Sequence, residues 1–443
     1  MMNFKIHRGA NEIGGSCVEF WTDTTRIVID IGMPLVNPDK TPFDSHEADS
    51  LSTDELIKKE ILPDIPSLYE DNSKTALFIS HSHQDHYGLV SRINPSCKVY
   101  LGFATQMLIE TLNTFIGEKW TIQNANHITH DRKIEIGNMG ITPYRMDHSA
   151  FDSYAFLIEA DGKSLIYSGD FRLHGRESAN FDWFCEKTRK NVDYLLMEGS
   201  TIGRTEEPFP TESELEEQFE VLFRQTKGIV LVQTSSHNID RLATIYNAAR
   251  NCNRYFLVDF FTANVLKSIN KRAKNSGIPY PSAHNFPGMK VYYPQYYIDR
   301  MNEIGKDAET IYRFPQYNKI GRDKLDDMAK DIVMLVKPSV RYDLKKYLHK
   351  YDDGCFIFSM WSGYKTQNSK VKNFLDFIKS KGMPIKDDIH TSGHADLPGL
   401  RRMVKTVRPK HLVPIHTFEG DKYEGLFPGT DVRRVADRET VSF

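Results

Sequence analysis

The sequence has few cysteines, and none lie close together along the chain. The five cysteines are scattered, at Cys17, Cys97, Cys185, Cys252 and Cys355. This spacing favours neither a disulfide framework nor a cysteine-based zinc site. We therefore expect the protein to be located in a reducing compartment.

Long apolar segments are also missing. The longest purely apolar stretches are four or five residues, whereas a membrane-spanning helix needs about 20. The first five residues lack the apolar core of a signal peptide. We therefore expect a cytoplasmic protein without a membrane partner.

No excess of one charge sign is present. Lys and Arg total 57 and Asp and Glu total 59. A generally basic surface is thus excluded, and any binding of nucleic acid must use local basic patches. A function in nucleic-acid chemistry has to be argued from a site rather than from net charge.

The chain does contain the ingredients of ordinary globular α/β domains. Its 443 residues are 40% hydrophobic and 26% charged, enough for about two to three domains. A helical pattern at residues 104–115 interrupts a series of short β-rich segments. These segments are residues 26–31, 75–80, 98–101, 154–158, 164–168 and 194–197.

The pattern changes after Gly203. A helix start at Thr211 is followed by alternating segments that predict a small doubly wound sheet. The predicted strands are residues 229–232, 255–258 and 356–359, and the helices are residues 239–249, 263–274 and 371–379. Histidine-rich motifs lie on both sides of this region, so we expect an inserted domain, with boundaries at 1–204, 205–355 and 356–443.

The segment 81–86 reads HSHQDH and follows a predicted strand directly. A tight loop leaving a strand can direct His81 and His83 to one ion, and Asp85 and His86 to a second. Imidazole and carboxylate ligands suit Zn²⁺ or Mn²⁺. Three histidines and an aspartate in six residues indicate metal binding far more than a chance surface loop.

This segment resembles the HxHxDH signature of the metallo-β-lactamase fold, and further motifs follow in the expected order. Later motifs resemble the β-CASP branch of that fold, and ribonuclease J in particular. The motifs are IVIDIG at 27–32, DHS at 147–149, SGD at 168–170, LLMEGST at 195–201, TSGHAD at 391–396 and VPIH at 413–416, with EIGG at 12–15 and TSSHNIDR at 234–241.

The resemblance implies a four-layer αββα sandwich formed by residues 1–204 and 356–443, with residues 205–355 as an inserted α/β β-CASP cap domain. It also implies two divalent ions, most simply zinc, with manganese as the alternative. One ion would be held by His81, His83 and His148, and the other by Asp85, His86 and His416. Asp170 would bridge the ions, and Asp30 would orient a ligand histidine.

The implied reaction is RNA cleavage by a hydroxide that the two ions activate, with Asp85 orienting it. The departing sugar oxygen needs a proton, which we assign to His394 held by Glu198; a purely structural histidine is the alternative. We further expect Ser235, Ser236, Asn238 and Arg241 to contact phosphate near a helix start, against simple helix capping. By the same motifs Ser392 and Gly393 are expected to contact RNA.

Three functions remain open at this stage. The first is a ribonuclease, exo- or endonucleolytic, acting on single-stranded RNA, with a homodimer possible. The second is a hydrolase of small esters, thioesters or cyclic phosphodiesters, which the same fold also hosts. The third is a non-catalytic RNA-binding subunit. The tyrosine-rich segment 291–297 could stack bases, but packing at the edge of a small domain is the more usual role.

Overall fold

The computed structural model describes residues 1–70, 75–270, 279, 286–305, 314 and 318–443. The chain divides into two compact units. Unit 1 is Met1–Gln106, Trp120–Phe209 and Gly393–Phe443, and unit 2 is Met107–Lys119 and Pro210–Ser392. Within the described residues, no helix is long and apolar enough to cross a membrane.

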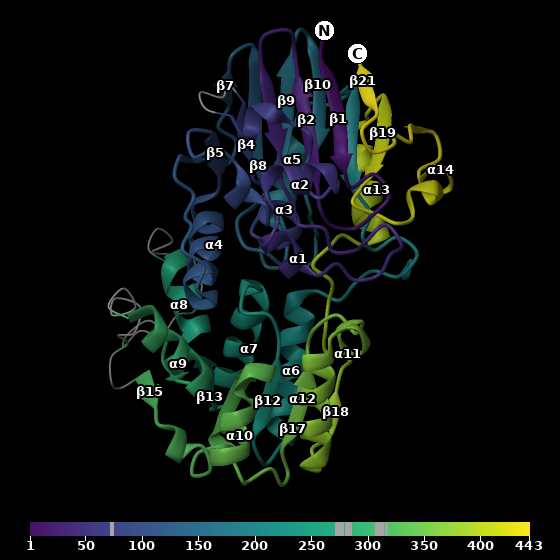
Figure 1. The fold of residues 1–443 in the computed structure, drawn as a ribbon. Coiled ribbons are helices and arrows are strands. Elements are labelled where there is room, and N and C mark those ends of the chain that lie inside the picture. The colour runs from purple at the N-terminus through teal and green to yellow at the C-terminus, as the bar shows by residue number, and fades with distance from the viewer. Residues whose placement is uncertain (71–74, 271–278, 280–285, 306–313, 315–317) are drawn as a thin grey trace. The chain divides into compact units, whose positions relative to one another are not determined.

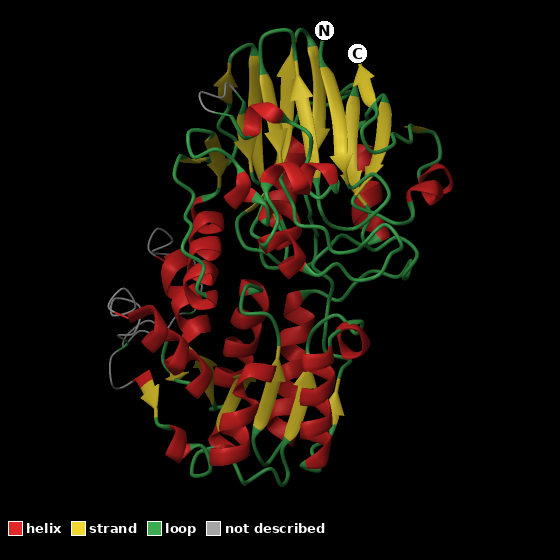
Figure 2. Ribbon diagram, viewed as in Figure 1, coloured by secondary structure: helices red, strands yellow, loops and turns green. Residues whose placement is uncertain are grey.

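Unit 1 is built on two seven-stranded sheets (Figures 1 and 2). The first sheet has the order β21-β1-β2-β3-β4-β5-β6. Its strands are β1 Asn3–Arg8, β2 Cys17–Trp21, β3 Arg26–Ile29, β4 Ala76–Phe78, β5 Lys98–Leu101, β6 Ala125–His127 and β21 Thr440–Ser442. The second has the order β20-β19-β11-β10-β9-β8-β7. Its strands are β7 Ile134–Ile136, β8 Met139–Met146, β9 Ser153–Ala160, β10 Lys163–Tyr167, β11 Tyr194–Glu198, β19 His411–Ile415 and β20 Asp431–Val432.

The two sheets share one buried core. Phe20 and Phe78 from the first sheet pack in a cluster with Phe156 and Leu196 from the second. Alternate residues of the second sheet, such as Leu195, pack instead with helices on its other face, as the two-residue period of a strand requires. This is the expected layered sandwich, which confirms the predicted fold class.

The helices of unit 1 are mostly short. They are α1 Ser45–Asp49, α2 Thr53–Lys58, α3 Gln84–Tyr87, α5 Ala179–Lys187, α13 Leu397–Val407 and α14 Tyr423–Leu426, with 3₁₀ turns at Pro66–Leu68, Val90–Arg92 and Gly420–Lys422. A longer helix, α4 Phe103–Ile116, begins in unit 1 and ends in unit 2. Its Phe115 packs on Phe260, Phe261 and Tyr297 of unit 2.

Unit 2 contains one seven-stranded parallel sheet in the order β15-β14-β13-β16-β12-β17-β18. Its strands are β12 Val230–Gln233, β13 Tyr255–Asp259, β14 Met289–Tyr292, β15 Lys319–Ile320, β16 Ile332–Val336, β17 Cys355–Phe358 and β18 Ile385–Lys386. Leu231 and Val232, which point to opposite faces of β12, are both fully buried. Burial on both faces is typical of a parallel sheet with helices on each side.

The helices of unit 2 are α6 Glu212–Gln225, α7 Ile239–Asn251, α8 Phe260–Asn270, α9 Gln295–Ile304, α10 Arg341–Tyr347, α11 Tyr364–Gln367 and α12 Ser369–Ser380, with 3₁₀ turns at Arg322–Lys324, Ala329–Asp331 and Pro338–Val340. The predicted start at Thr211 is confirmed: its hydroxyl accepts the Glu214 amide while Glu214 accepts the Thr211 amide. The predicted helix at 263–274 corresponds to α8, and its last four residues lie outside the described part of the chain.

The expected boundary at residue 356 requires correction. β17 pairs in parallel with β12, and β18 pairs with β17, so residues 356–392 complete the sheet of unit 2. The chain returns to unit 1 at Gly393. The second histidine motif therefore begins where the chain changes units.

Candidate metal centre

The metal centre is assembled at the strand ends and loops of unit 1. His81 follows β4, His83 is the residue before α3, and Asp85 and His86 lie within the first turn of α3. The ends of β8, β10 and β19 are followed by His148, Asp170 and His416. The structure thus brings together all seven residues that the motifs predict as ligands, although they come from four separate parts of the sequence.

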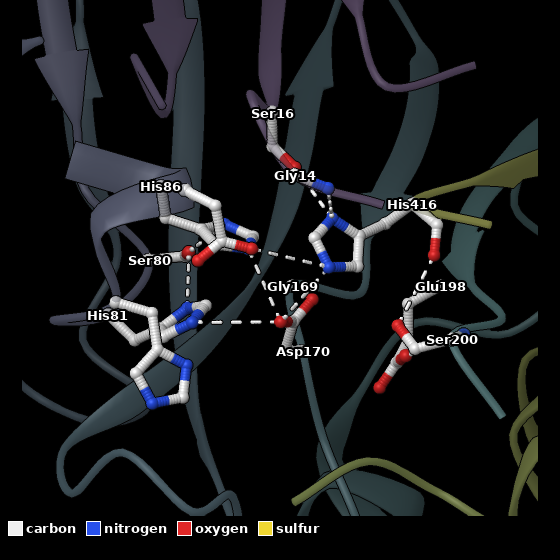
Figure 3. Close-up of polar contacts among 12 residues, drawn as sticks. Gly14, Ser16, Ser80, His81, His86, Gly169, Asp170, Glu198, Ser200 and His416 are labelled. Carbon is white, nitrogen blue, oxygen red and sulfur yellow. Dashed lines mark hydrogen bonds and ion pairs between the residues drawn. The ribbon is translucent and has the colours of Figure 1, made fainter. Parts of the chain in front are cut away.

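Asp170 belongs to one group of potential ligands and lies beside a second, and it also forms a group with His394 and His416. His81, His83, His148 and Asp170 offer ligand atoms within 4.8 Å of one another, and Asp85, His86 and His416 form a second such group. Asp170 Oδ2 lies 3.2 Å from His86 Nε2 and 3.6 Å from both His81 Nε2 and His416 Nε2. Figure 3 shows these three imidazoles directed at the Asp170 carboxylate.

The donor spacing fits metal ions. Ligand atoms about 2.0 Å from a tetrahedral zinc ion lie roughly 3.3 Å apart, and His148 Nε2 is 3.2 Å from His83 Nδ1. Within the described residues, four atoms of the cluster are buried without a hydrogen-bond partner: His81 Nε2, His86 Nε2, His416 Nε2 and Asp170 Oδ2. Buried polar atoms of this kind are costly unless a ligand satisfies them. A metal cation bound by these four ligand atoms would satisfy them.

The protonation states of all but one of the shifted ligand side chains also suit metal binding. Burial lowers the pKa of His83 to about 4 and that of His81 and His148 well below its usual value. Burial likewise lowers the pKa of His416. For Asp170, burial acts upward, but the facing histidines, His416 first, hold its pKa well below the ordinary value. His86 differs: burial lowers its pKa, but Asp170, Asp30 and Asp85 outweigh burial and raise the pKa well above the usual value. Metals bind neutral imidazoles and ionised carboxylates, so His86 would release a proton as an ion binds.

Asp30 lies directly behind His86. His86 Nδ1 donates to Asp30 Oδ2 at 2.7 Å, which leaves Nε2 directed at Asp170. Asp30 also accepts the Ser80 amide and hydroxyl and the Tyr167 hydroxyl at 2.7–2.8 Å. This arrangement matches the predicted orienting position of Asp30.

Other ligands are held in a similar way. His148 Nδ1 donates to the carbonyl of Gly393 at 2.6 Å, and a Cβ on Gly393 would lie 2.3 Å from Ser149 Oγ. His416 Nδ1 lies 2.9 Å from Ser16 Oγ (Figure 3). Gly393, predicted to contact RNA, thus has a defined structural task in orienting a ligand histidine.

Sequence reasoning missed several of these supporting residues. Ser80 directly precedes the motif at 81–86, and Ser16 directly follows the motif at 12–15. Their positions next to these motifs were the only indication of their role. Asp147 and Arg172 form a fully buried ion pair, with Nε to Oδ1 at 3.0 Å, that ties the His148 loop to the Asp170 loop. Nothing in the sequence pairs these two residues.

His394 and Glu198 lie next to the ligand cluster. His394 Nδ1 is 3.0 Å from Glu198 Oε2 and 3.7 Å from Asp170 Oδ2. The amides of Phe171 and Ser200 donate to the buried Glu198 carboxylate. Burial lowers the pKa of His394, but Glu198 and then Asp170 outweigh it and the net shift is upward. The pair is therefore arranged to hold a proton beside the centre.

The four residues near α7 that were predicted to contact phosphate lie in different environments. Arg241 is a correction: its guanidinium is fully buried and paired with Glu212 at 2.9 Å, so it is already neutralised. Ser236 is buried and its hydroxyl bonds to Thr262 Oγ1 at 2.7 Å. Asn238 caps α7 by accepting the Arg241 amide, as the capping alternative predicts. Ser235 alone of this group is exposed.

The family comparisons agree with the site. Residues 59–232 match the model described as "Beta-lactamase superfamily domain". Residues 382–423 match "Zn-dependent metallo-hydrolase RNA specificity domain". The two ranges contain every predicted ligand. Two segments of the chain are therefore similar to a β-lactamase superfamily domain and to a zinc-dependent metallo-hydrolase domain.

Curated relatives extend this similarity along the chain. Ribonuclease J of Helicobacter pylori is 24% identical over 423 residues, covering 92% of this chain and 55% of the relative. Ribonuclease J of Mycoplasma genitalium is 21% identical over 427 residues, covering 92% and 66%. The resemblance to ribonuclease J is confirmed, and the chain spans little more than half the length of the first of these relatives.

A solved structure shows the same fold. The protein titled "Crystal Structure of a Protein of Unknown Function from Enterococcus faecalis V583" matches with a TM-score of 0.77 and 23% identity, covering 99% of each chain. At this level of identity the likeness shows the fold alone, and it extends over the whole chain.

Proposed function

We propose that this chain is a metal-dependent ribonuclease that cleaves single-stranded RNA with two ions, most simply zinc. The observation that carries the proposal is Asp170, whose unpaired Oδ2 lies between two ligand groups and beside the His394–Glu198 pair. Phosphodiester cleavage requires the same set of parts: an activated water, charge neutralisation at phosphorus and a proton donor.

The protein residues have separate tasks in this reaction. His81, His83 and His148 would hold one ion, and Asp85, His86 and His416 the other, with Asp170 shared between them. Bound divalent ions supply a water of lowered pKa and neutralise the phosphate oxygens. Asp85, whose side chain is 14% exposed, would accept a hydrogen bond from the attacking water and orient it.

His394 would protonate the departing sugar oxygen. Its Nδ1 lies 3.0 Å from Glu198 Oε2, so the carboxylate would hold the protonated imidazole in place for transfer to the substrate. The nearby Glu198 carboxylate favours the protonated imidazole, while burial and the Arg204 charge oppose it. Histidine suits this task because its ordinary pKa is close to neutrality.

RNA is favoured over the small-molecule alternatives by two findings. The matched C-terminal model is described by RNA specificity, and the curated relatives are named as ribonuclease J. A non-catalytic role is disfavoured because every predicted ligand is present and clustered. Ser235 and Ser392 remain proposed contacts for the RNA backbone, and homodimerisation and a cytoplasmic location stay predictions.

The experiment is product mapping on denaturing gels. The purified chain with Zn²⁺ or Mn²⁺ is incubated with 5′-monophosphate, 5′-triphosphate and circular RNAs of one sequence, and with the matching DNA. We expect cleavage of RNA, lost in Asp170→Asn, with circular RNA separating internal from terminal cleavage. Uncut RNA under all of these conditions, together with turnover of a thioester or cyclic phosphodiester, would overturn the proposal.

A further inference from the structure

Two exposed aromatic side chains lie close together in the loop that follows β17 in unit 2. Trp361 is 40% exposed and Tyr364 is 41% exposed, and their ring centroids are 5.5 Å apart in an edge-to-face arrangement. Ser362 between them is also exposed. Other large aromatic side chains, such as Tyr342, are also exposed, but Trp361 and Tyr364 are both exposed and in contact with each other.

The loop holds the Trp361 ring in place. A Cβ on Gly363 would lie 2.3 Å from the indole of Trp361, so the ring rests directly on the glycine backbone. The Tyr364 amide donates to the Trp361 carbonyl at 3.2 Å, and α11 begins there. A glycine under the ring and a turn of helix beside it pre-organise an exposed aromatic surface.

The tyrosine-rich segment 291–297 behaves differently. Tyr292 and Tyr297 are buried, and the ring of Tyr293 stacks on Phe260 with centroids 5.0 Å apart. Three of its tyrosines thus pack within unit 2, as the edge-packing alternative expects. The Trp361–Tyr364 pair offers the better aromatic surface for a ligand.

The pair lies where ligands bind to sheets of this kind. Figure 1 shows α11 at one end of the sheet of unit 2. β12 and β17 are adjacent, and the Ser359 amide donates to the Gln233 carbonyl at 3.0 Å, so the two strands end level. The chain leaves β12 toward β13 and leaves β17 toward β18, on opposite sides. Such a topological switch point is the usual ligand site of a parallel sheet.

The neighbouring groups suit a nucleotide. The loop after β12 presents the exposed hydroxyl of Ser235 at the same edge of the sheet. Lys365, directly after Tyr364, pairs with Asp387. That carboxylate neutralises the Lys365 charge, so the polar groups that remain are the hydroxyls of Ser235 and Ser362. An aromatic pair with hydroxyls at the same edge differs from a broad apolar patch, because it offers a π face for a base and polar groups for a backbone.

We propose that Trp361 and Tyr364 form a stacking platform for a base of single-stranded RNA at the carboxyl edge of the unit 2 sheet. The platform rests on the proposed ribonuclease function and adds a substrate-binding element outside the metal centre. Because every base has a π face, stacking here gives affinity without strong sequence preference.

Binding is tested without cleavage, in the Asp170→Asn background with a 5′-labelled single-stranded 12-mer RNA and fluorescence anisotropy. Trp361→Ala is expected to weaken binding about tenfold and Tyr364→Ala about threefold, whereas Trp361→Phe retains most of the affinity. The matched control is Trp183→Ala, which removes a tryptophan 44% exposed on α5 of unit 1 and is expected to leave binding unchanged.

An abasic scan identifies the stacked base. Removing one base at a time should weaken binding about tenfold at one position with Trp361, and should have no effect at that position with Trp361→Ala. Gly363→Ala, which displaces the ring while keeping the tryptophan, should weaken binding severalfold. Thermal unfolding checks that each variant is folded.

The outcomes separate the two proposals. If the chain cleaves RNA but Trp361→Ala and Gly363→Ala bind it as tightly as the Asp170→Asn parent, the platform is wrong and the ribonuclease stands. If the abasic effect depends on Trp361 while no RNA is ever cleaved, the platform stands and the ribonuclease is wrong. If the folded parent binds no RNA, the platform is overturned, and cleavage alone then decides the proposed function.

Discussion

Unit 1 and unit 2 each bury charged side chains near the carboxyl ends of their strands, but they satisfy them in opposite ways. In unit 2, the Glu212 carboxylate accepts hydrogen bonds from the Arg241 guanidinium and the Thr244 hydroxyl at 2.8–3.2 Å. The two opposite charges therefore neutralise each other. In unit 1, Asp170 Oδ2 and three imidazole nitrogens are left without hydrogen bonds among the described residues. Single unpaired buried atoms also occur in unit 2, such as Gln233 Oε1. The comparison teaches that neither buried charge nor one unpaired atom marks a functional site, whereas several unpaired ligand atoms that converge on one carboxylate do.

The largest effect should follow the loss of the shared ligand. Asp170→Asn keeps the side-chain volume but removes the charge between the two ligand groups. We expect the bound metal, measured by mass spectrometry, to fall from two ions to fewer than one per chain. RNA cleavage should fall about 1,000-fold or more, equivalent to roughly 4 kcal/mol. A variant that keeps both ions and full activity would contradict the shared role of Asp170.

In unit 2 the same kind of change should affect folding instead. Glu212→Ala leaves the fully buried Arg241 charge without its partner, which should lower the free energy of unfolding by about 3–5 kcal/mol. Urea titration measures the change, and metal content should stay constant. The control is Glu212→Leu combined with Arg241→Met, which removes both charges and should recover most of the stability. Loss of metal in Glu212→Ala would contradict the separation of the two networks.

His394 should separate proton transfer from metal binding. In His394→Gln, we expect RNA cleavage to fall about 100- to 1,000-fold, as for loss of a general acid, while metal content is unchanged. Single-turnover kinetics with saturating enzyme isolates the chemical step. Full activity would remove His394 from the acid role, and loss of an ion would make it a ligand.

The smallest effect is expected behind the ligands. Asp30→Asn weakens the hydrogen bond that orients His86, and should lower metal affinity about 10- to 100-fold. Competition with a chelator measures the change. The matched control is Asp431→Asn, which alters an exposed carboxylate 2.6 Å from His411 and should have no effect. Equal effects in both variants would mean that the buried pairing has no special influence on the metal.

Much of this protein was predictable from local sequence. The HSHQDH segment predicted metal binding from its residue types and their spacing. The resemblance of the later motifs to the metallo-β-lactamase fold implied the contributions of His148, Asp170 and His416. Strands such as β5 were predicted with correct bounds, since short apolar β-rich segments ending at polar residues are distinctive. The start of α6 at Thr211 was also predicted, and the structure shows a capping box there.

Only the tertiary structure decided how these parts are used. Arg241 looked like a phosphate ligand in the sequence, but Glu212 and burial make it part of the core. Residues 356–392 looked like a return to the first domain, but pairing of β17 with β12 assigns them to unit 2. The chemistry of a side chain depends only on the residue type, so the sequence determined which groups can bind metal. Pairing and burial depend on residues distant along the chain, so only the folded structure decided which of those groups are left free to do so.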